Sequence, residues 1–219
     1  MNYEQARRNM IEQQLRPWEV LDAGVVDLLY ADRRENFVPA AQRALAFADV
    51  ALPLSPAAAM LPPKLEAHCV QALALKPHER ALEIGTGSGH MAALLAARVK
   101  EVQSVEIDPQ LAAAARANLA NAGIDNVQVE VGDGLAGLAS HAPFDVIVVS
   151  GGVQAVPAAL LEQLAVGGRL LAFVALAGQE PLLAMRLITR TAADVVTSED
   201  LMETVVPFMQ QPAAPRFAF

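Results

Sequence analysis

Arg80-Ala-Leu-Glu-Ile-Gly-Thr-Gly-Ser-Gly-His90 decides the fold of this chain, because an apolar strand pattern runs into three alternating glycines and a helical pattern follows. A turn between a strand and a helix lets a ligand approach the backbone closely only where no Cβ intervenes. The N–H groups at the start of the helix then point outward toward that ligand. The stretch therefore predicts a loop that holds a nucleotide cofactor, and we call residues 85–89 the glycine loop.

The glycine spacing and the acid ahead of it indicate which cofactor the loop holds. Counted from Gly85, a dinucleotide fingerprint needs a glycine at position 90, where this chain has His90. Glu83 precedes the first glycine by two residues. Its carboxylate would repel a pyrophosphate but attract the ammonium and sulfonium groups of S-adenosylmethionine. The loop therefore favours a methyl donor over NAD.

Two further acids follow strand-like runs and support this interpretation. Glu106 ends the run 101–106 and lies 23 residues after Glu83, close to the spacing of an acid that binds ribose hydroxyls. Asp133 lies in the turn after the run 127–131, where it can accept a hydrogen bond from the adenine amino group. Each acid alone is typical of a solvated loop. Their order at three strand ends predicts one ligand crevice at the carboxyl edge of the sheet.

The order of helical and strand patterns predicts an α/β protein with a Rossmann-like, doubly wound, mostly parallel sheet, an antiparallel edge hairpin and N-terminal helices. We expect a single domain over 1–219, with a helical, substrate-side segment at 1–79, the cofactor-binding sheet at 80–209 and an extended tail at 210–219. The expected helices cover 3–15, 20–31, 62–75, 90–99, 109–122 and 157–165. The expected strands cover 80–84, 101–106, 127–131, 145–149 and 169–174, with the edge hairpin near 182–189 and 202–208.

Six segments besides the glycine loop occur in the order of a known family: Asn9-Met-Ile-Glu-Gln-Gln-Leu-Arg-Pro17, Asn36-Phe-Val-Pro39, Ala51-Leu-Pro53, Val131-Gly-Asp-Gly134, Ala142-Pro-Phe-Asp145 and Leu160-Leu-Glu-Gln-Leu-Ala-Val-Gly-Gly-Arg-Leu170. Together they resemble the class I S-adenosylmethionine-dependent methyltransferases and, among these, the protein-L-isoaspartate O-methyltransferases. The glycine loop and the acids resemble the superfamily as a whole. The first two segments are what single out the isoaspartyl branch.

The resemblance implies an enzyme, an S-adenosylmethionine-dependent O-methyltransferase that acts on the side-chain or alpha carboxylate of isoaspartyl residues in damaged proteins, which is a repair reaction. It places the methionine part of the donor on the glycine loop, the ribose on Glu106 and the adenine on Asp133. The implied partner is a protein or peptide that carries isoaspartate, or a small-molecule carboxylate. The full set of implied donor-binding residues is Glu83, Gly85, Thr86, Gly87, Gly89, Glu106, Ile107, Gly132, Asp133 and Gly134.

One segment departs from the family pattern. The family has a stretch like Gly-His-Gly-Gln-Thr-Ile-Ser-Gln-Pro after Ala-Leu-Pro, whereas this chain has Leu54-Ser-Pro-Ala-Ala-Ala-Met-Leu-Pro-Pro63. A gapless alignment puts Ala59 at the Thr position and Leu61 at the Ser position, which carries the active-site hydroxyl in the family. Neither side chain donates a hydrogen bond, although a carboxylate that leaves water needs donors. Ser55 is a candidate replacement if the alignment shifts by six positions, so the catalytic residue stays open.

Three functions therefore remain open. The first is methyl transfer to an isoaspartyl carboxylate, which needs no general base because the nucleophile is already ionised. The second keeps the donor but changes the acceptor, with residues 57–61 lining a pocket for another acid or a small apolar molecule. The third is a donor-binding module without catalysis.

The remaining ionisable residues show no pattern typical of a metal or nucleic-acid site. The histidines other than His90 stand singly without metal-ligand spacing, so we expect no metal. We interpret His90 as a residue that caps or packs at the start of its helix. The pairs Arg7-Arg8 and Arg33-Arg34 are interpreted as solvated helix faces. A net charge of −8 with dispersed basic residues argues against a nucleic-acid partner.

Composition is typical of a compact enzyme. A hydrophobic share of 54% over 219 residues is enough to bury a large core. Cys69 is the only cysteine, so an internal disulfide is excluded and a reducing compartment is indicated. The N-terminus lacks the apolar core of a secretory signal, and the longest apolar stretches are short or broken by prolines. We expect a cytoplasmic protein without a membrane partner.

Overall fold

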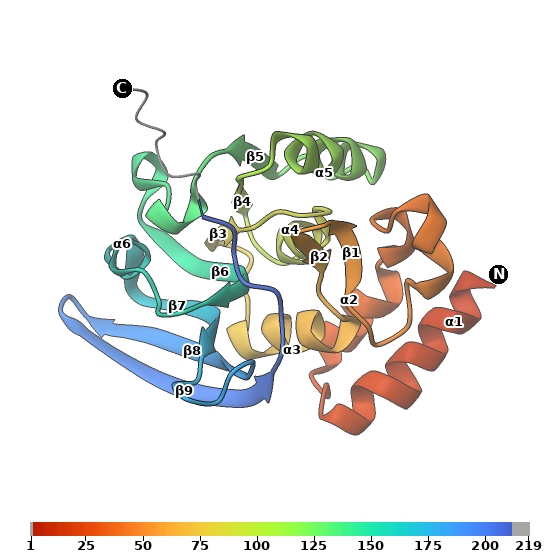
Figure 1. Cartoon of the computed structure of the whole chain (residues 1–219), viewed down its shortest axis with the longest axis horizontal. Coiled ribbons are helices and arrows are strands. Elements are labelled where there is room, and N and C mark those ends of the chain that lie inside the picture. Colours follow the sequence, from red (N-terminus) through yellow and green to blue (C-terminus); the bar gives the residue numbers. More distant parts are fainter. Residues whose placement is uncertain (1, 212–219) are drawn as a thin grey trace.

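A seven-stranded mixed sheet forms the centre of the computed structural model, which describes residues 2–211 (Figure 1). The strand order is β5-β4-β3-β6-β7-β8-β9. The first five strands in this order are parallel to one another, whereas β8 pairs antiparallel with both β7 and β9. The order reverses between β3 and β6, which is where doubly wound sheets bind ligands. The α/β fold with an antiparallel edge hairpin is thus confirmed. The strands are β3 (Arg80–Ile84), β4 (Glu101–Glu106), β5 (Val127–Val131), β6 (Phe144–Val153), β7 (Leu164–Ala175), β8 (Leu183–Ala192) and β9 (Val195–Thr204).

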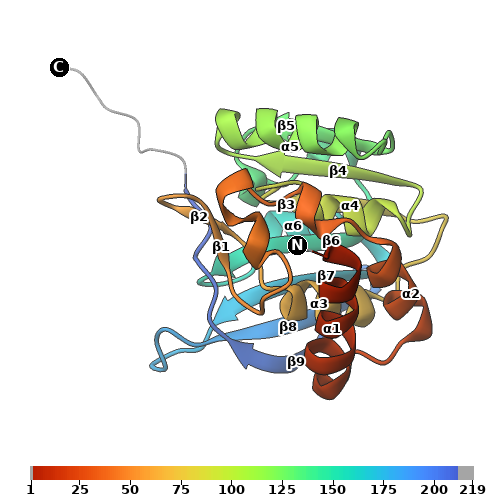
Figure 2. The same ribbon diagram turned by 90° about the vertical axis from the view of Figure 1, so that its right-hand side faces the viewer.

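Two apolar cores cover the two faces of the sheet. Alternate strand residues separate into them because side chains along a strand point to opposite faces, so that Ala81 belongs to one core and Leu82 to the other. The helices α1 to α4 pack on the first face, whereas Leu160 of α6 packs on the second. Figure 2 shows α1 and α2 in front of the sheet. The α-helices are α1 (Tyr3–Met10), α2 (Ala23–Ala31), α3 (Pro63–Leu73), α4 (His90–Ala96), α5 (Pro109–Asn121) and α6 (Ala158–Glu162); a π-helix (Ile11–Leu15) continues α1.

The sequence pattern predicted the second strand of the edge hairpin too late in the chain. The structure has β9 at Val195–Thr204 instead of 202–208, because a tight turn at Ala193 and Asp194 joins it directly to β8. The sequence obscured this strand because most of β9 is exposed and it contains the polar run 197–200. An edge strand that carries charges resists pairing with other chains.

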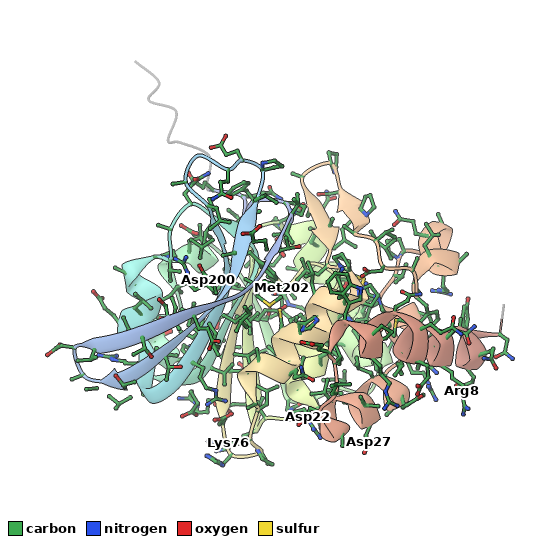
Figure 3. The ribbon with its side chains drawn as sticks, turned by 90° about the horizontal axis from the view of Figure 1, so that it is seen from below. Arg8, Asp22, Asp27, Lys76, Asp200 and Met202 are labelled. Atoms are coloured by element: carbon green, nitrogen blue, oxygen red, sulfur yellow. The ribbon has the colours of Figure 1, made fainter. Side chains whose placement is uncertain are left out.

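Charge pairing across the hairpin is visible at its outer strand. Arg186 of β8 pairs with Asp200 of β9 at 2.5 Å between Nε and Oδ1, and Figure 3 shows Asp200 and Met202 on that strand. Met202 is half-buried and packs against the first core. The hairpin thus extends the sheet with one covered face and one polar face.

Other boundaries differ from the expectation by a few residues. The helix expected at 20–31 begins at Ala23, because the Asp22 side chain accepts a hydrogen bond from Val25 N–H (2.9 Å) and caps it. The helix expected at 157–165 ends at Glu162, since β7 already begins at Leu164. Only two residues of the expected tail at 210–219 lie within the described part of the chain. Within that part, every helix is too short or too polar to cross a bilayer.

Candidate active site

The glycine loop connects β3 to α4 in a conformation that requires its glycines. Gly85, Gly87 and Gly89 have φ values of +89°, +53° and +85°, a region that residues with a Cβ rarely adopt. The Gly85 N–H donates to the carbonyl of Val105 (2.8 Å), which joins the loop to β4. The alternation of glycines in the sequence therefore reflects the backbone path at the switch point of the sheet.

Glu83 is fully buried beneath the glycine loop. Ser104 Oγ and Ser150 Oγ donate to its carboxyl group at 2.7 and 3.1 Å. Burial raises the pKa of Glu83 to about 8 in spite of these hydrogen bonds. The sequence led to the expectation of an ionised Glu83, whereas the raised pKa favours the protonated form at neutral pH. Thr86 is also buried, and its hydroxyl lies 2.6 Å from Ser104 Oγ.

Glu106 joins the glycine loop to the loop after β4. Its Oε2 accepts from Gly87 N–H (2.8 Å) and its Oε1 from Asp108 N–H (3.0 Å). Asp133 lies on the neighbouring strand end, where its exposed carboxylate accepts from Leu135 N–H (3.0 Å). The adjacent Gly134 is required for packing, because a Cβ there would lie 2.5 Å from Ile84. The acids expected at three strand ends thus lie along one edge of the sheet.

Two adjoining cavities open at this edge, which we call the outer cleft and the inner pocket. They share Ala59, Gly85, Gly87 and Ser150. The outer cleft is also lined by Ala57, Ala58, Glu106, Ile107, Gly151, Pro207, Phe208, Met209 and Gln210. The inner pocket is also lined by Leu54, Met60, Leu61, Glu66, Glu83, Thr86, Ser88 and Met91. Asp133 lines neither cavity, nor do its neighbours Gly132 and Gly134.

A short hairpin that the sequence did not predict covers the inner pocket. Its strands are β1 (Leu52–Ser55) and β2 (Ala58–Met60), with Ala59 opposite Pro53. Ala59 of the hairpin and Leu61 just after it lie at the pocket wall, and these are the positions at which the gapless alignment expects the family hydroxyls. The Ser55 side chain lines neither cavity and accepts from Ala57 N–H (3.3 Å) at the hairpin turn. The structure therefore brings no hydroxyl from this segment into the pocket.

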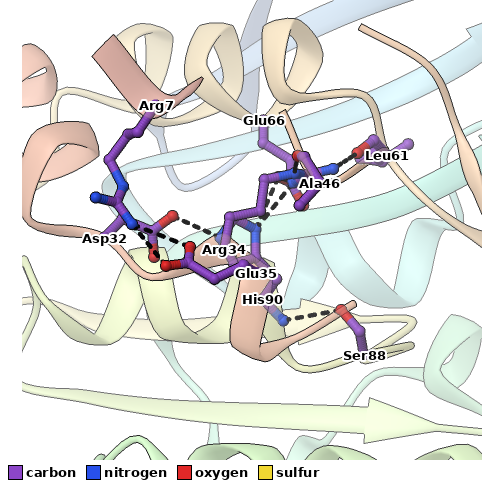
Figure 4. A network of polar contacts seen from close by, with 9 residues as sticks. All are labelled: Arg7, Asp32, Arg34, Glu35, Ala46, Leu61, Glu66, Ser88 and His90. Carbon is purple, nitrogen blue, oxygen red and sulfur yellow. Dashed lines mark hydrogen bonds and ion pairs between the residues drawn. The ribbon is translucent and has the colours of Figure 1, made fainter. Parts of the chain in front are cut away.

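A buried network of charges lies behind the hairpin (Figure 4). Arg34 pairs with Glu66, and its Nη2 donates to the carbonyl of Leu61 (2.7 Å). His90 lies between two carboxylates, with Nδ1 2.8 Å from Glu66 and Nε2 2.9 Å from Asp32. Burial alone would lower the pKa of His90, but Glu66 and Asp32 outweigh it and raise the value to about 9. His90 packs at the start of its helix as expected, and its raised pKa favours the protonated ring within this network.

The interpretation of the paired arginines as solvated faces is confirmed for Arg8 and Arg33, which are exposed, but is wrong for Arg7 and Arg34. Arg34 is 2% exposed and Arg7 is 1% exposed, with Arg7 forming two bonds to Glu35 at 2.8 and 3.0 Å. The sequence carried no signal for these pairs, because Arg34, Glu66 and His90 lie in separate elements. Among residues 2–211, no cluster of three or more histidines, cysteines or acids has the geometry of a metal site.

The chain is similar over most of its length to proteins of one family. The family model described as Protein-L-isoaspartate(D-aspartate) O-methyltransferase matches residues 5–211. The protein-L-isoaspartate O-methyltransferase of Roseiflexus castenholzii is 40% identical over 203 residues, which are 93% of this chain and 91% of that protein. The enzyme of the same name from Methylorubrum populi is 43% identical over 195 residues, which are 89% and 90% of the two chains.

Solved structures agree on the fold. A protein-L-isoaspartate O-methyltransferase superposes with a TM-score of 0.80 at 25% identity, covering 94% of this chain and 66% of that longer chain. The chain thus spans just under two thirds of that structure but nearly the whole of the relatives above. A putative enzyme of the same kind from Plasmodium falciparum, in complex with S-adenosyl-L-homocysteine, has a TM-score of 0.80 at 18% identity and covers 96% and 99% of the two chains.

Proposed function

The chain belongs to the protein-L-isoaspartate(D-aspartate) O-methyltransferase family, and from this premise we propose that it transfers a methyl group from S-adenosylmethionine to the carboxylate of isoaspartyl residues in damaged proteins. The observation that carries the proposal is the match of the family model over residues 5–211, which includes both the cleft and the hairpin that covers the inner pocket. The expected partner is a protein or peptide that carries isoaspartate; a small-molecule carboxylate remains the alternative acceptor.

The residues at the cleft fit the donor. S-adenosylmethionine supplies an activated methyl group on a sulfonium. The glycine loop presents backbone without side chains, and Glu83 beneath it can release a proton to match an ammonium. Each carboxylate oxygen of Glu106 accepts a hydrogen bond from one backbone N–H group. Each can accept a further hydrogen bond from a ribose hydroxyl. Thr86 and Ile107 contribute to the cavity walls, whereas the contact of Asp133 with adenine remains a proposal.

The inner pocket suits a reaction in which opposite charges cancel. Leu54, Leu61 and Met91 line it, so a bound carboxylate there would lose much of its water. A carboxylate nucleophile needs no base, and holding it in line with the methyl group can supply a large part of the rate. The chain's own task is then to orient the acceptor and to exclude water.

Replacing Glu106 with alanine is expected to weaken donor binding by about 1–3 kcal/mol, because hydrogen bonds to the ribose are lost. Calorimetric titration with S-adenosylhomocysteine measures the change. Glu130→Ala is the matched control, since Glu130 lies opposite Val105 on the neighbouring strand β5 and outside both cavities. Equal affinity of the Glu106 variant and the parent protein would show that the ribose binds elsewhere.

The wall of the inner pocket favours a second candidate function, the same donor with a different acceptor. Ala59 and Leu61 present no hydrogen-bond donor, and Glu66 adds a carboxyl group to the lining. A substrate carboxylate would meet an apolar wall at the hairpin side of the pocket, and burying it there without a donor is costly. A methyl acceptor without a negative charge therefore fits Ala59 and Leu61 better than it would fit the Thr and Ser of the family pattern.

Replacing Ala59 with Thr and Leu61 with Ser together is expected to raise the rate of methyl transfer to an isoaspartyl peptide about tenfold or more, because it restores two donors near the carboxylate. One oriented donor in a dry site changes rates by roughly 10²–10³ in favourable cases. Ala57→Ser on the rim of the outer cleft is the control for the mere addition of a hydroxyl. Unchanged rates in a folded double variant would mean that the pocket takes another acceptor.

The direct test of the proposed function uses labelled S-adenosylmethionine and two peptides that differ only in aspartate or isoaspartate. Label in the isoaspartyl peptide alone supports the proposal. Label in neither peptide, with donor binding shown by calorimetry, favours another acceptor or a donor-binding module. The division of the chain into 1–79, 80–209 and 210–219 within one domain, and a cytoplasmic location, remain predictions.

A further inference from the structure

The chain after β9 lies across the outer cleft, and we call residues 205–211 the C-terminal strap. In Figure 1 it is the blue segment that leaves β9 and passes between β6 and the hairpin β1–β2. The Gly152 N–H donates to the Pro207 carbonyl (2.8 Å), and the Met209 N–H donates to the Gly152 carbonyl (2.8 Å). These bonds form an isolated bridge rather than a strand. Few backbone bonds therefore hold the strap against the end of β6.

Met209 fills the space beside two glycines of the cleft. A Cβ on Gly85 would lie 2.8 Å from Met209 Cε, and a Cβ on Gly151 would lie 2.6 Å from Met209 Sδ. Both distances are well below the roughly 3.5–4.0 Å of a normal carbon contact. The thioether therefore lies directly on the backbone of these glycines. The space that the missing side chain of Gly85 leaves open for a ligand is already occupied.

The position of Met209 is stabilised by apolar packing. Its side chain is half-buried and packs against the second core, which includes Ile84 at the end of β3 and Val149 within β6. Val206, earlier in the strap, is buried at 4% exposure and anchors it. Met209 and Gln210 are half-buried, whereas Gln211 is exposed. The anchor and the bridge thus hold Met209 over the glycine loop.

We propose that the C-terminal strap gates the donor site: the Met209 side chain occupies part of that site in the free protein, and S-adenosylmethionine binds only after the strap has moved. A ligand that reaches the Gly85 backbone and Glu106 needs volume that the thioether fills. The proposal rests on the donor binding at the glycine loop, as in the proposed function, but it does not depend on the acceptor.

Gating has a measurable consequence for affinity. The apparent affinity of a ligand falls in proportion to the fraction of protein in the binding-competent state. Truncation of Met209 should enlarge that fraction, because the closed strap then leaves the cleft accessible. If Met209 instead forms a wall against the bound donor, truncation should weaken binding. The sign of the change therefore distinguishes a gate from a wall.

The test is calorimetric titration of the full chain with S-adenosylhomocysteine. Met209→Ala is expected to bind about tenfold more tightly than the parent protein. Met209→Leu keeps the bulk and should bind within about twofold of the parent. Val205→Ala is the control, since Val205 belongs to the same strap, is 57% exposed and lines neither cavity. Hydrogen exchange of the Met209 and Gly152 amides should also speed up when the ligand binds.

Equal or weaker binding by Met209→Ala, with an unchanged control, would overturn the gate. Amides that stay protected in the complex would do the same, since the strap would then not have moved. If neither the parent protein nor Met209→Ala binds S-adenosylhomocysteine, the gate fails together with the donor site. Tighter binding by Met209→Ala without methyl transfer to an isoaspartyl peptide would support the gate and count against the proposed function alone.

Discussion

Raising the pH from 6 to 7, where the ammonium of the ligand is still mostly protonated, is expected to strengthen S-adenosylmethionine binding about tenfold. Burial raises the pKa of Glu83 to about 8, although hydrogen bonds from Ser104 and Ser150 oppose the rise. At pH 6 the free protein therefore holds a proton on Glu83, and that proton must leave when an ammonium binds beside the carboxyl group. Well below this pKa, each pH unit changes the affinity about tenfold.

Proton release measures this linkage directly. Calorimetric titration in buffers of different ionisation enthalpy should detect about one proton released per bound ligand at pH 6. Glu83→Gln is the matched control, because it keeps the shape of the side chain and cannot ionise. Its affinity should be nearly the same at pH 6 and pH 7. A flat pH profile of the parent protein would contradict the assignment of the ammonium to Glu83.

Replacing Arg34 with alanine is expected to lower the free energy of unfolding by about 3–5 kcal/mol, because removal of one partner leaves a buried charge uncompensated. Arg34 is 2% exposed and pairs with Glu66. It also donates to the carbonyls of Ala46 (2.8 Å) and Leu61 (2.7 Å), so the variant leaves two more groups without their partner. The second of these bonds anchors the end of the hairpin at the inner pocket.

Urea unfolding measures this change, and the adjacent arginine is the control. The Arg33 side chain is 49% exposed and lies 3.4 Å from the exposed Glu4. Exposed ion pairs contribute little to the free energy of unfolding, so Arg33→Ala should change it by less than about 1 kcal/mol. Similar unfolding midpoints for the two variants would mean that the network of Arg34, Glu66 and His90 does not stabilise the fold.

The strands β3, β4 and β5 could be predicted to the residue from the sequence. Each is a short run with a strand pattern and ends in glycines or an acid, so neighbouring residues carry all the information needed. The edge hairpin was predicted in kind, with its first strand close to its observed position and its second strand too late in the chain. Exposure of β9 removes the apolar alternation by which a strand is recognised. The hairpin β1–β2 was missed because prolines interrupt a very short pairing.

The sequence by itself determined the glycine loop, the order of the acids at the strand ends and the family, because these features depend on residues that are close in the chain. Only the tertiary structure decided that burial raises the pKa of Glu83, that Arg34 and His90 are buried with Glu66, and that Met209 lies on the glycine loop. Burial and contact across the fold set these properties, since the pKa of a group depends on its distance from water and from other charges. Residues dozens of positions apart become neighbours only when the sheet and its covering helices assemble.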